Sequence, residues 1–267
     1  MDFKSRCKKI REEILELARH SRRGHIPSAF SLVETLVTLY DDVLKFDAKN
    51  PDWKLRDRLI LSKGHGCMAL YSILADKNFF SREHFAGFCQ LDGILGGHPT
   101  REKIPGCEAS TGSLGHGLSI AIGMALNAKI EELNYRTFVI LGDGECNEGS
   151  IWEAALSASH NRLDNLYVLI DYNKYQSYGS TNEVCDLEPF ADKWRAFGFD
   201  THEFDMRKKP EELKSFFEDH RPISGTPVAI ICHTIKGQGA ASLEGNLSWH
   251  HRSKISDEDL SSIKDEL

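Results

Sequence analysis

The pattern of apolar and polar positions along the chain predicts an α/β protein, in which segments with helical spacing alternate with short apolar runs typical of strands. Helical spacing opens the sequence, through Ile10, Ile14, Leu15, Leu17 and Ala18. A second helix is expected in SAFSLVETLVTLYDDVL, with Ser28 or Ser31 as its N-cap. Strand-like runs then occur in DRLILS, RTFVILGDGE, NLYVLIDYN, the end of DKWRAFGFDTHEFD, and TPVAIICHTIKGQG. The segments between them that we expect to be helical are CMALYSILADKN, SIAIGMALNAKIEEL, GSIWEAALSASHNRL, DKWRAF and PEELKSFFEDH.

Nearly continuous apolar strands that alternate with helices indicate a parallel sheet with helices on both faces. No linker and no internal repeat divides the sequence, so residues 1–267 are expected to form one domain. The helix in SIAIGMALNAKIEEL is expected to be buried, because alanine and other small residues fill one side of it. The passage from Leu91 to Gly117 is rich in glycine and lacks periodicity, which predicts a long loop. Loops of that length inside a domain are commonly functional.

Ligands bind at the carboxyl ends of the strands in such sheets. The loops that follow the strands therefore matter most, namely SKGHG, LGDGE, DYNKY and TIKGQG. All four place polar side chains beside glycine or directly after an apolar run. We expect a binding site where these loops meet.

Composition and charge narrow the function classes. Hydrophobic residues make up 40% and charged residues 27% of the chain, which is typical of globular proteins. The formal net charge of -7 argues against a nucleic-acid partner. No apolar run is long enough for a membrane span, and no signal peptide is recognisable. Seven scattered cysteines without a Cys-x-x-Cys pair indicate reduced thiols in the cytoplasm.

Two neighbouring strands end in small oxygen-bearing residues about thirty positions apart. Asp143 stands between two glycines that permit a sharp turn, and Asn173 follows the next apolar run. Carboxylate, amide and carbonyl oxygens suit Mg²⁺ or Ca²⁺, and Mg²⁺ commonly keeps positions open for substrate phosphates. The amides of Gly144 and Glu145, close to the start of a helix, could also bind a phosphate. The spacing alone leaves a pair of plain turns as an alternative.

Histidines beside glycine or proline are the second chemical signal. They stand at His25, His65, His98 and His116, and a further pair is His250–His251. Such positions suit hydrogen bonding or proton transfer near neutral pH better than core packing. A zinc site is the competing interpretation, but no His-x-x-x-His or His/Cys pair supports it.

At this point the sequence resembles the transketolase family. The resemblance is carried by GHIPSAFS, LSKGHGCMALYS, DGILGGHP, STGSLGHGLSIAIGMA, LGDGECNEGSIWEAALSASHNRLDNLYVLIDYN and TIKGQGAASLEGNLSWH, in the family's order. Together they cover nearly the whole chain and are similar to the N-terminal, pyrophosphate-binding domain of transketolase. The Gly-Asp-Gly with a later asparagine resembles the motif that binds thiamine diphosphate. The resemblance thus implies a thiamine diphosphate-binding fold and a transfer of two-carbon ketol units.

The resemblance also implies a role for individual residues. Metal ligands would be Asp143, Asn173 and the carbonyl of Tyr175. Cofactor contacts would come from Ser28, His65, Gly112, Ser113, Leu114, Asp143, Gly144, Glu145, Asn173, Lys236 and His250. The sugar would face His25, His65, His98 and His250, which would bind its hydroxyls and move protons. Glu148 resembles a buried carboxylate that links paired active sites, or is simply a glutamate favoured at a helix N-terminus.

Three positions depart from the family pattern. His116 stands where glutamine is usual, His251 follows His250 where glycine is common, and Ile26 separates His25 from Pro27. These departures lie near the expected sugar channel and bear on substrate preference. The metal and diphosphate ligands are unaffected.

A full transketolase also carries a pyrimidine-binding domain, whose glutamate activates the cofactor. We expect that a separate C-terminal transketolase subunit supplies this glutamate, in an α2β2 assembly that uses sugar phosphates, with no nucleic acid or membrane partner. One alternative is a component of an enzyme that condenses a keto acid with an aldehyde, as 1-deoxyxylulose-5-phosphate synthase does. The other is a non-catalytic regulatory homologue.

Overall fold

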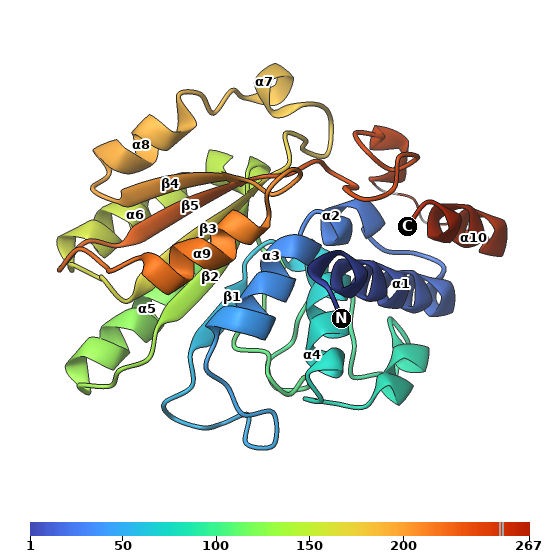
Figure 1. Ribbon diagram of the computed structural model, residues 1–267, viewed down its shortest axis with the longest axis horizontal. Helices are drawn as coiled ribbons and strands as arrows, with labels where there is room; N and C mark the ends of the chain where they lie inside the picture. Colours follow the sequence, from blue (N-terminus) through green and yellow to red (C-terminus); the bar gives the residue numbers. More distant parts are fainter. Residues whose placement is uncertain (251, 253) are drawn as a thin grey trace.

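Five parallel strands form one sheet in the computed structural model, in the order β1-β2-β3-β5-β4 (Figure 1). The structure describes residues 1–250, 252 and 254–267. His251, one of the departures from the family pattern, lies outside the described residues. The strands are β1 Arg58–Leu61, β2 Thr137–Gly142, β3 Leu166–Tyr172, β4 Asp200–Asp205 and β5 Val228–His233. Each expected strand is therefore present, and all neighbours pair in parallel.

Helices cover both faces of the sheet, as the sequence predicts (Figure 1). Successive residues of β2 point to opposite sides, so Phe138 and Ile140 pack into one core while Val139 and Leu141 pack into another. The first core takes the apolar side chains of α1 Phe3–Ser21, α4 Cys67–Asp76 and α9 Glu211–Asp219. The second takes those of α5 Gly117–Ile130, α6 Gly149–His160 and α8 Phe190–Ala196. Every residue of β2 and β3 is buried, as expected for central parallel strands.

The expected second helix is broken into shorter pieces. It forms α2 Ile26–Phe30, α3 Val33–Thr38 and a π-helical turn, η1 Leu39–Val43. The prediction that Ser28 or Ser31 caps it is wrong. His25 occupies the N-cap position of α2 and Ser28 lies buried within that helix, while the Ser31 hydroxyl donates to Asp171 Oδ2 at 2.6 Å. The Ser31 side chain thus makes a tertiary hydrogen bond and does not cap a helix.

The expected buried helix, α5, is buried on one side only. Leu118, Ala121 and Ala125 pack into the core, whereas Ile120 is 38% and Ile130 is 75% exposed. The passage from Leu91 to His116 has no helix or strand, as predicted. It leads directly into the N-terminus of α5, which places its last residues beside the ends of β1 and β2.

Several short elements were not expected from the sequence. They are α7 Thr181–Val184, α10 Asp257–Asp265 and the 3-10 turns η2 Gly64–Gly66, η3 Arg82–Gly87, η4 Gly144–Asn147 and η5 Leu247–Trp249. A capping box begins α10, in which Ser256 accepts from the Asp259 amide and Asp259 accepts from the Ser256 amide. All seven cysteines are free thiols. Across the described residues, no helix has the length and apolar character to cross a membrane.

Candidate active site

The loops after β1, β2, β3 and β5 enclose a cavity of about 320 Å³ at the carboxyl edge of the sheet. Most of the predicted site residues line it, namely His25, Ser28, His65, Gly112, Leu114, Asp143, Gly144, Glu145, Glu148, Asn173, Tyr175, Lys236 and His250. Residues as far apart as 25 and 250 are thus brought together. Ser113 is exposed and does not line this cavity, and His98 lines a neighbouring one. The loops meet where the position rule for parallel sheets places a ligand.

Asp143 and Asn173 are both buried and both hold a turn. Asp143 Oδ1 accepts from the Gly144 amide at 2.7 Å, and Oδ2 accepts from the Lys174 amide at 2.6 Å. Asn173 Oδ1 accepts from the Tyr175 amide at 3.1 Å. Each of these oxygens has a second lone pair that these bonds do not use. The two turns and a cation site are therefore compatible, because the turns fix the direction of the oxygens.

Among the described residues, no cationic side chain forms an ion pair with the Asp143 carboxylate, although the nearby Lys63 charge acts to lower its pKa. Burial, and secondarily the neighbouring Asp171 carboxylate, raise the pKa of Asp143 to about 7. A divalent cation beside these oxygens would favour the ionised form and reverse that shift. The donor set is all oxygen, which fits a hard cation such as Mg²⁺.

A buried ion pair that was not foreseen lies under this site. Lys63 Nζ donates to Asp171 Oδ2, and the two side chains are 1% and 3% exposed. Asp171 also accepts from Ser31, Asn173 and Thr234. Burial alone would raise the pKa of Asp171, but the Lys63 ammonium and these hydrogen bonds hold it below its ordinary value. Lys63 follows β1 in SKGHG and Asp171 lies near the end of β3, so the sequence places both at the carboxyl ends of the strands, but it does not reveal that they pair.

Lys236 adds a second buried ammonium group to the cavity. Its side chain is 3% exposed and its Nζ donates to the Gln176 carbonyl at 3.4 Å. Among the residues that the structure describes, no carboxylate lies within ion-pair distance of it. Burial, then the nearby Lys63 charge, lower the pKa of Lys236 to about 8. The Lys236 ammonium is therefore suited to pair with an anion such as a diphosphate.

Glu145 lines the cavity, and its carboxylate oxygens are used to hold the surrounding loops together. Its Oε1 accepts from the Ser62 hydroxyl and from the Gly115 amide at 2.9 Å, and its Oε2 accepts from the Gly142 amide at 3.0 Å. The side chain thus ties the end of β1, the end of β2 and the loop before α5 together. Only the backbone amide of Glu145 is left as the phosphate contact that the sequence predicts.

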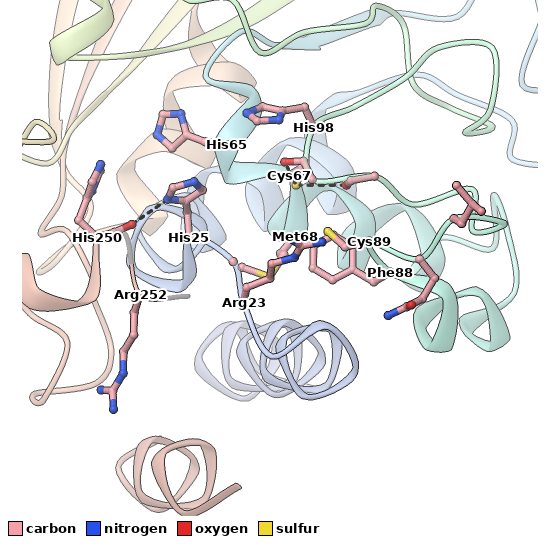
Figure 2. Close-up of a pocket in the computed structure, with 15 residues that line it drawn as sticks. Arg23, His25, His65, Cys67, Met68, Phe88, Cys89, His98, His250 and Arg252 are labelled. Carbon is pink, nitrogen blue, oxygen red and sulfur yellow. Dashed lines mark hydrogen bonds between the residues drawn. The ribbon is translucent and has the colours of Figure 1, made fainter. Parts of the chain in front are cut away.

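The loop histidines line a larger cavity of about 780 Å³ that adjoins the first one. His25, His65 and His250 belong to both cavities, and His98 belongs to the larger one (Figure 2). The His25 ring lies 5.5 Å from the His65 ring and 5.7 Å from the His250 ring. His25 Nδ1 is 2.8 Å from the His250 carbonyl, and His250 Nε2 is 3.1 Å from the Ser177 hydroxyl. The three rings thus form the passage between the two cavities.

The charge state of these imidazoles follows from their surroundings. Burial, and then the positive charge of Lys63 and the neighbouring imidazoles, hold the pKa of His65 well below its usual value. Burial also lowers the pKa of His98. Both rings are therefore neutral near pH 7, and each can donate from one nitrogen and accept at the other. His116 is different: it is exposed, contacts its own loop at the Leu114 carbonyl, and lines neither cavity.

Glu148 is exposed at the N-cap position of α6, and its side chain makes no capping hydrogen bond. It stands at the edge of the smaller cavity. The resemblance to transketolase implies a buried carboxylate at Glu148, but Glu148 is not buried in this chain by itself. The alternative, a carboxylate favoured by the helix N-terminus, agrees with its position.

Comparisons with known proteins identify the family of this chain. A family model described as the thiamine diphosphate binding domain of transketolase matches residues 4–267. The chain is 41% identical over 246 residues to an apulose-4-phosphate transketolase subunit of Phocaeicola vulgatus, and the match covers 91% of this chain and 86% of that protein. It is also 41% identical over 251 residues to the 6-deoxy-6-sulfo-D-fructose transketolase subunit SqwG of a Clostridium species, covering 94% and 91%.

A solved transketolase from Leishmania mexicana has the same fold, with a TM-score of 0.91 and 29% identity. The likeness covers 100% of this chain and 41% of that one, so the present chain spans less than half the length of that enzyme. The family that the sequence motifs predicted is therefore confirmed, together with its fold.

Proposed function

Since the chain belongs to the transketolase family, we propose that it is the thiamine diphosphate-binding subunit of a two-component transketolase. The observation that carries this proposal is the joined pair of cavities. One is lined by buried oxygen donors and a buried lysine, the other by imidazoles, and they share His25, His65 and His250. The first cavity would thus bind the charged diphosphate of the cofactor, and the adjoining one would bind a polyhydroxy substrate.

The smaller cavity would hold the metal and the diphosphate. Asp143, Asn173 and the Tyr175 carbonyl would bind Mg²⁺, because their oxygens suit a hard cation and Asp143 needs a positive charge beside it. The Gly144 and Glu145 amides, Lys236 and Ser28 would bind the phosphates. Bound there, thiamine diphosphate supplies the carbon nucleophile and the electron sink that no protein side chain offers.

The loop before α5 would bind the cofactor's pyrimidine. Gly112 and Leu114 line the same cavity as Asp143, and Ser113 stands between them in the sequence. Gly112 has φ +147°, and a Cβ there would come 3.1 Å from His98 Cδ2. The absence of a side chain therefore leaves room for the His98 ring to lie against this loop.

His25, His65, His98 and His250 would bind the sugar and transfer protons to and from it. Neutral His65 and His98 would each donate a hydrogen bond to one hydroxyl oxygen or accept one from its proton. His25 is oriented by the His250 carbonyl, and His250 by Ser177. Protons could then pass between substrate and imidazole without exposure to bulk water.

We propose an anionic ketose as donor and an aldose as acceptor. The relatives are named for apulose-4-phosphate and for 6-deoxy-6-sulfo-D-fructose, and each of these carries an acidic group. Arg23, which lines the larger cavity, would add positive charge for such a group. Those relatives are named as subunits, which supports a separate C-terminal partner in an α2β2 assembly. The free cysteines support a reducing, cytoplasmic setting.

The test measures cofactor binding and reaction separately. Calorimetry with thiamine diphosphate and Mg²⁺ compares the unaltered chain with Asp143→Asn, in the presence of a purified C-terminal transketolase subunit from the same source. We expect Asp143→Asn to weaken binding by at least the roughly 10–100-fold that loss of an outer-shell metal partner costs. The matched control, Asp52→Asn, changes an exposed aspartate far from the cavity and should bind normally.

Product analysis then tests the reaction. The complete assembly should transfer a ketol unit from a ketose phosphate to an aldose phosphate, and the chain alone should not. Condensation of pyruvate with an aldehyde would instead identify the keto-acid alternative. Cofactor binding without any product would identify a non-catalytic homologue, and ketol transfer by the chain alone would refute the two-component proposal.

A further inference from the structure

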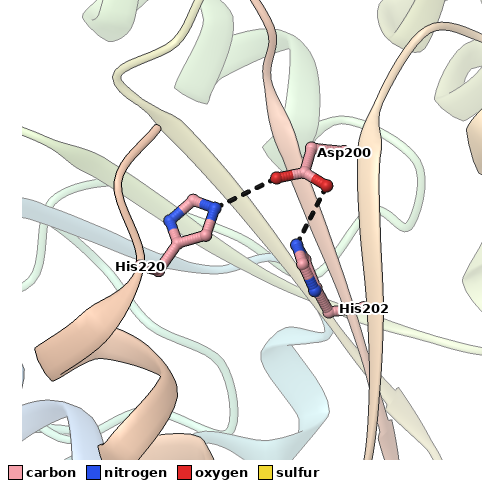
Figure 3. Close-up of side chains that lie close together, drawn as sticks. All are labelled: Asp200, His202 and His220. Carbon is pink, nitrogen blue, oxygen red and sulfur yellow. Dashed lines mark hydrogen bonds and ion pairs between the residues drawn. The ribbon is translucent and has the colours of Figure 1, made fainter. Parts of the chain in front are cut away.

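A second cluster of metal-binding side chains lies at the opposite edge of the sheet. Asp200 and His202 are on β4, which is an edge strand, and His220 is the C-cap residue directly after α9 (Figure 3). Asp200 is the first residue of β4, so the cluster lies at the amino-terminal ends of the strands. The two joined cavities lie at their carboxyl ends. Among the residues that the structure describes, these three alone form a group of histidine, cysteine or carboxylate side chains arranged to hold a metal.

The three ligand atoms already converge. His220 Nε2 lies 3.0 Å from Asp200 Oδ2, and His202 Nε2 lies 3.0 Å from Asp200 Oδ1. All the ligand atoms lie within 4.8 Å of one another. Ligands that surround a tetrahedral zinc ion at 2.0–2.1 Å are about 3.4 Å apart. The observed spacing thus needs only small side-chain rotations to match.

The local structure explains why these side chains meet. Asp200 and His202 are two positions apart on a strand, so their side chains point to the same face. The end of α9 brings His220 back over that face, where its amide donates to the Phe216 carbonyl at 2.7 Å. The Phe216 ring packs 4.7 Å from the His202 ring and 4.4 Å from the His220 ring. Both imidazoles are therefore held in orientation before any ligand binds.

The cluster is partly buried but open to a small ion. The side chains of His202, Asp200 and His220 are 32%, 18% and 10% exposed. In the absence of a metal, both Nε2 atoms can satisfy the carboxylate only by carrying a proton. A divalent cation would bind both Nε2 atoms once each ring carries its single proton on Nδ1, so that its ligands are two neutral imidazoles and one carboxylate.

We propose that Asp200, His202 and His220 form a zinc-class transition-metal site that fastens the edge strand β4 to the end of α9. Imidazole nitrogen with one carboxylate favours Zn²⁺, Ni²⁺ or Cu²⁺ over Mg²⁺ and Ca²⁺. The remaining coordination position faces solvent and takes water. The site is separate from the oxygen-rich Mg²⁺ site proposed at the other edge, and its function is to stabilise the sheet edge.

The experiment titrates tag-free, full-length chain, stripped with a chelator, with Zn²⁺ by calorimetry and with Co²⁺ by visible absorption. We expect one equivalent of Zn²⁺ to bind, an intense tetrahedral-type Co²⁺ spectrum, and a rise in Tm of several degrees with Zn²⁺. His220→Gln and Asp200→Asn should each weaken Zn²⁺ binding by at least tenfold and abolish the Tm rise.

Two controls separate this site from other histidines. His233→Gln removes a comparable imidazole, which pairs with Glu203 at 2.9 Å without a third ligand, and should bind Zn²⁺ normally. His25→Gln tests the imidazoles of the joined cavities and should also leave binding unchanged. Circular dichroism of each variant confirms folding. The proposal is overturned if Zn²⁺ fails to bind, if binding survives in folded His220→Gln, or if it is lost in His25→Gln.

Discussion

Two buried lysines face the smaller cavity, and they differ in what neutralises them. Lys63 is paired with Asp171, whereas Lys236 contacts only the Gln176 carbonyl within the described part of the chain. This difference separates a structural role from a binding role. It also allows a separate prediction for each residue.

The charge of Lys236 should set the upper pH limit of cofactor binding. Burial lowers its pKa from 10.5 to about 8, so the ammonium form is present below pH 8 and is lost as the pH rises through that value. We expect the affinity for thiamine diphosphate to fall above pH 8 in calorimetric titrations from pH 6.5 to 9.5. Lys236→Arg should keep its charge throughout that range and remove the alkaline loss, whereas Lys236→Met should bind weakly at every pH. An unchanged alkaline limit in Lys236→Met would contradict the assignment.

The same shift predicts an effect on stability. Between pH 8 and 10.5, Lys236 is protonated in the unfolded chain but not in the folded chain, so the free energy of unfolding rises with pH in this range. Below pH 8, Lys236 is charged in both states, and the folded chain bears the full cost of burying that charge. At pH 7, Lys236→Met should therefore have a free energy of unfolding about 3 kcal/mol higher than that of the unaltered chain, as measured by urea unfolding. No gain in stability would mean that the ammonium is better solvated than its burial indicates.

Lys63 should behave in the opposite way. Lys63→Met leaves the Asp171 carboxylate buried without its cation, and removing one partner of a buried pair costs about 3–5 kcal/mol. The double variant Lys63→Met/Asp171→Asn removes both charges and should recover most of that loss in urea unfolding. A single variant as stable as the double one would show that the pair does not contribute in this way.

At the residue scale, the oxygen-bearing side chains and histidines of the loops were recognisable from the sequence. The buried residues that hold them in place were not. Asp143, Asn173 and Lys236 follow strands in glycine-bearing loops and do line the cavity. The partners of Asp171 come from loops far away in sequence, and a lone lysine or aspartate gives no signal of such a pair. The Asp200–His202 spacing was visible, but a search for histidine pairs and His/Cys pairs overlooks Asp-x-His on a strand.

At the element scale, the loop before α5 depends on one backbone conformation. Gly112 has φ +147°, and a Cβ there would come 3.1 Å from His98 Cδ2. We expect Gly112→Ala to lower the free energy of unfolding by about 1–3 kcal/mol, because L-residues are strained in that region. It should also weaken thiamine diphosphate binding in calorimetry.

A matched alanine substitution in the following helix should have the opposite sign. Gly123 lies within α5, and a Cβ there meets no atom within 4 Å. Gly123→Ala should therefore raise the stability by about 0.5–1 kcal/mol, as expected for a glycine in a helix interior. Equal effects of the two variants on urea unfolding would contradict the strain argument for Gly112.

The sequence predicted the existence of elements better than their ends. Strands with unbroken apolar runs were recognised because burial on both faces imposes that pattern. The segment from Ser28 to Leu44 was predicted as one helix, yet it is divided after Phe30, where the Ser31 hydroxyl hydrogen-bonds Asp171 on β3. Such a tertiary contact has no signature in local spacing. The helix α10 was overlooked although its capping sequence, Ser256 to Asp259, was present.

At the scale of the whole molecule, α5 and α6 leave an apolar surface uncovered. The two helices pack against each other, and Ile120, Ile130 and Leu156 on them are 38%, 75% and 60% exposed. A helix with apolar residues on all sides is typical of a buried position. The prediction that α5 is buried was thus wrong for the chain alone, but its composition indicates that another subunit covers it. Glu148 begins α6 beside this surface and would be buried with it.

We therefore expect this surface, defined by Ile120 and Leu156, to form a subunit interface. Placing a charge there should oppose association, because a charge buried without a partner is costly. Ile120→Glu combined with Leu156→Glu should lower the mass measured by light scattering after size exclusion, both for the chain and for its complex with the C-terminal subunit. Ile223→Glu changes an exposed residue, 57% accessible, outside these helices and should leave the mass unchanged. Circular dichroism would show whether the double variant still folds. A folded double variant that keeps its mass would exclude this surface as the interface, and with it the burial of Glu148 between subunits.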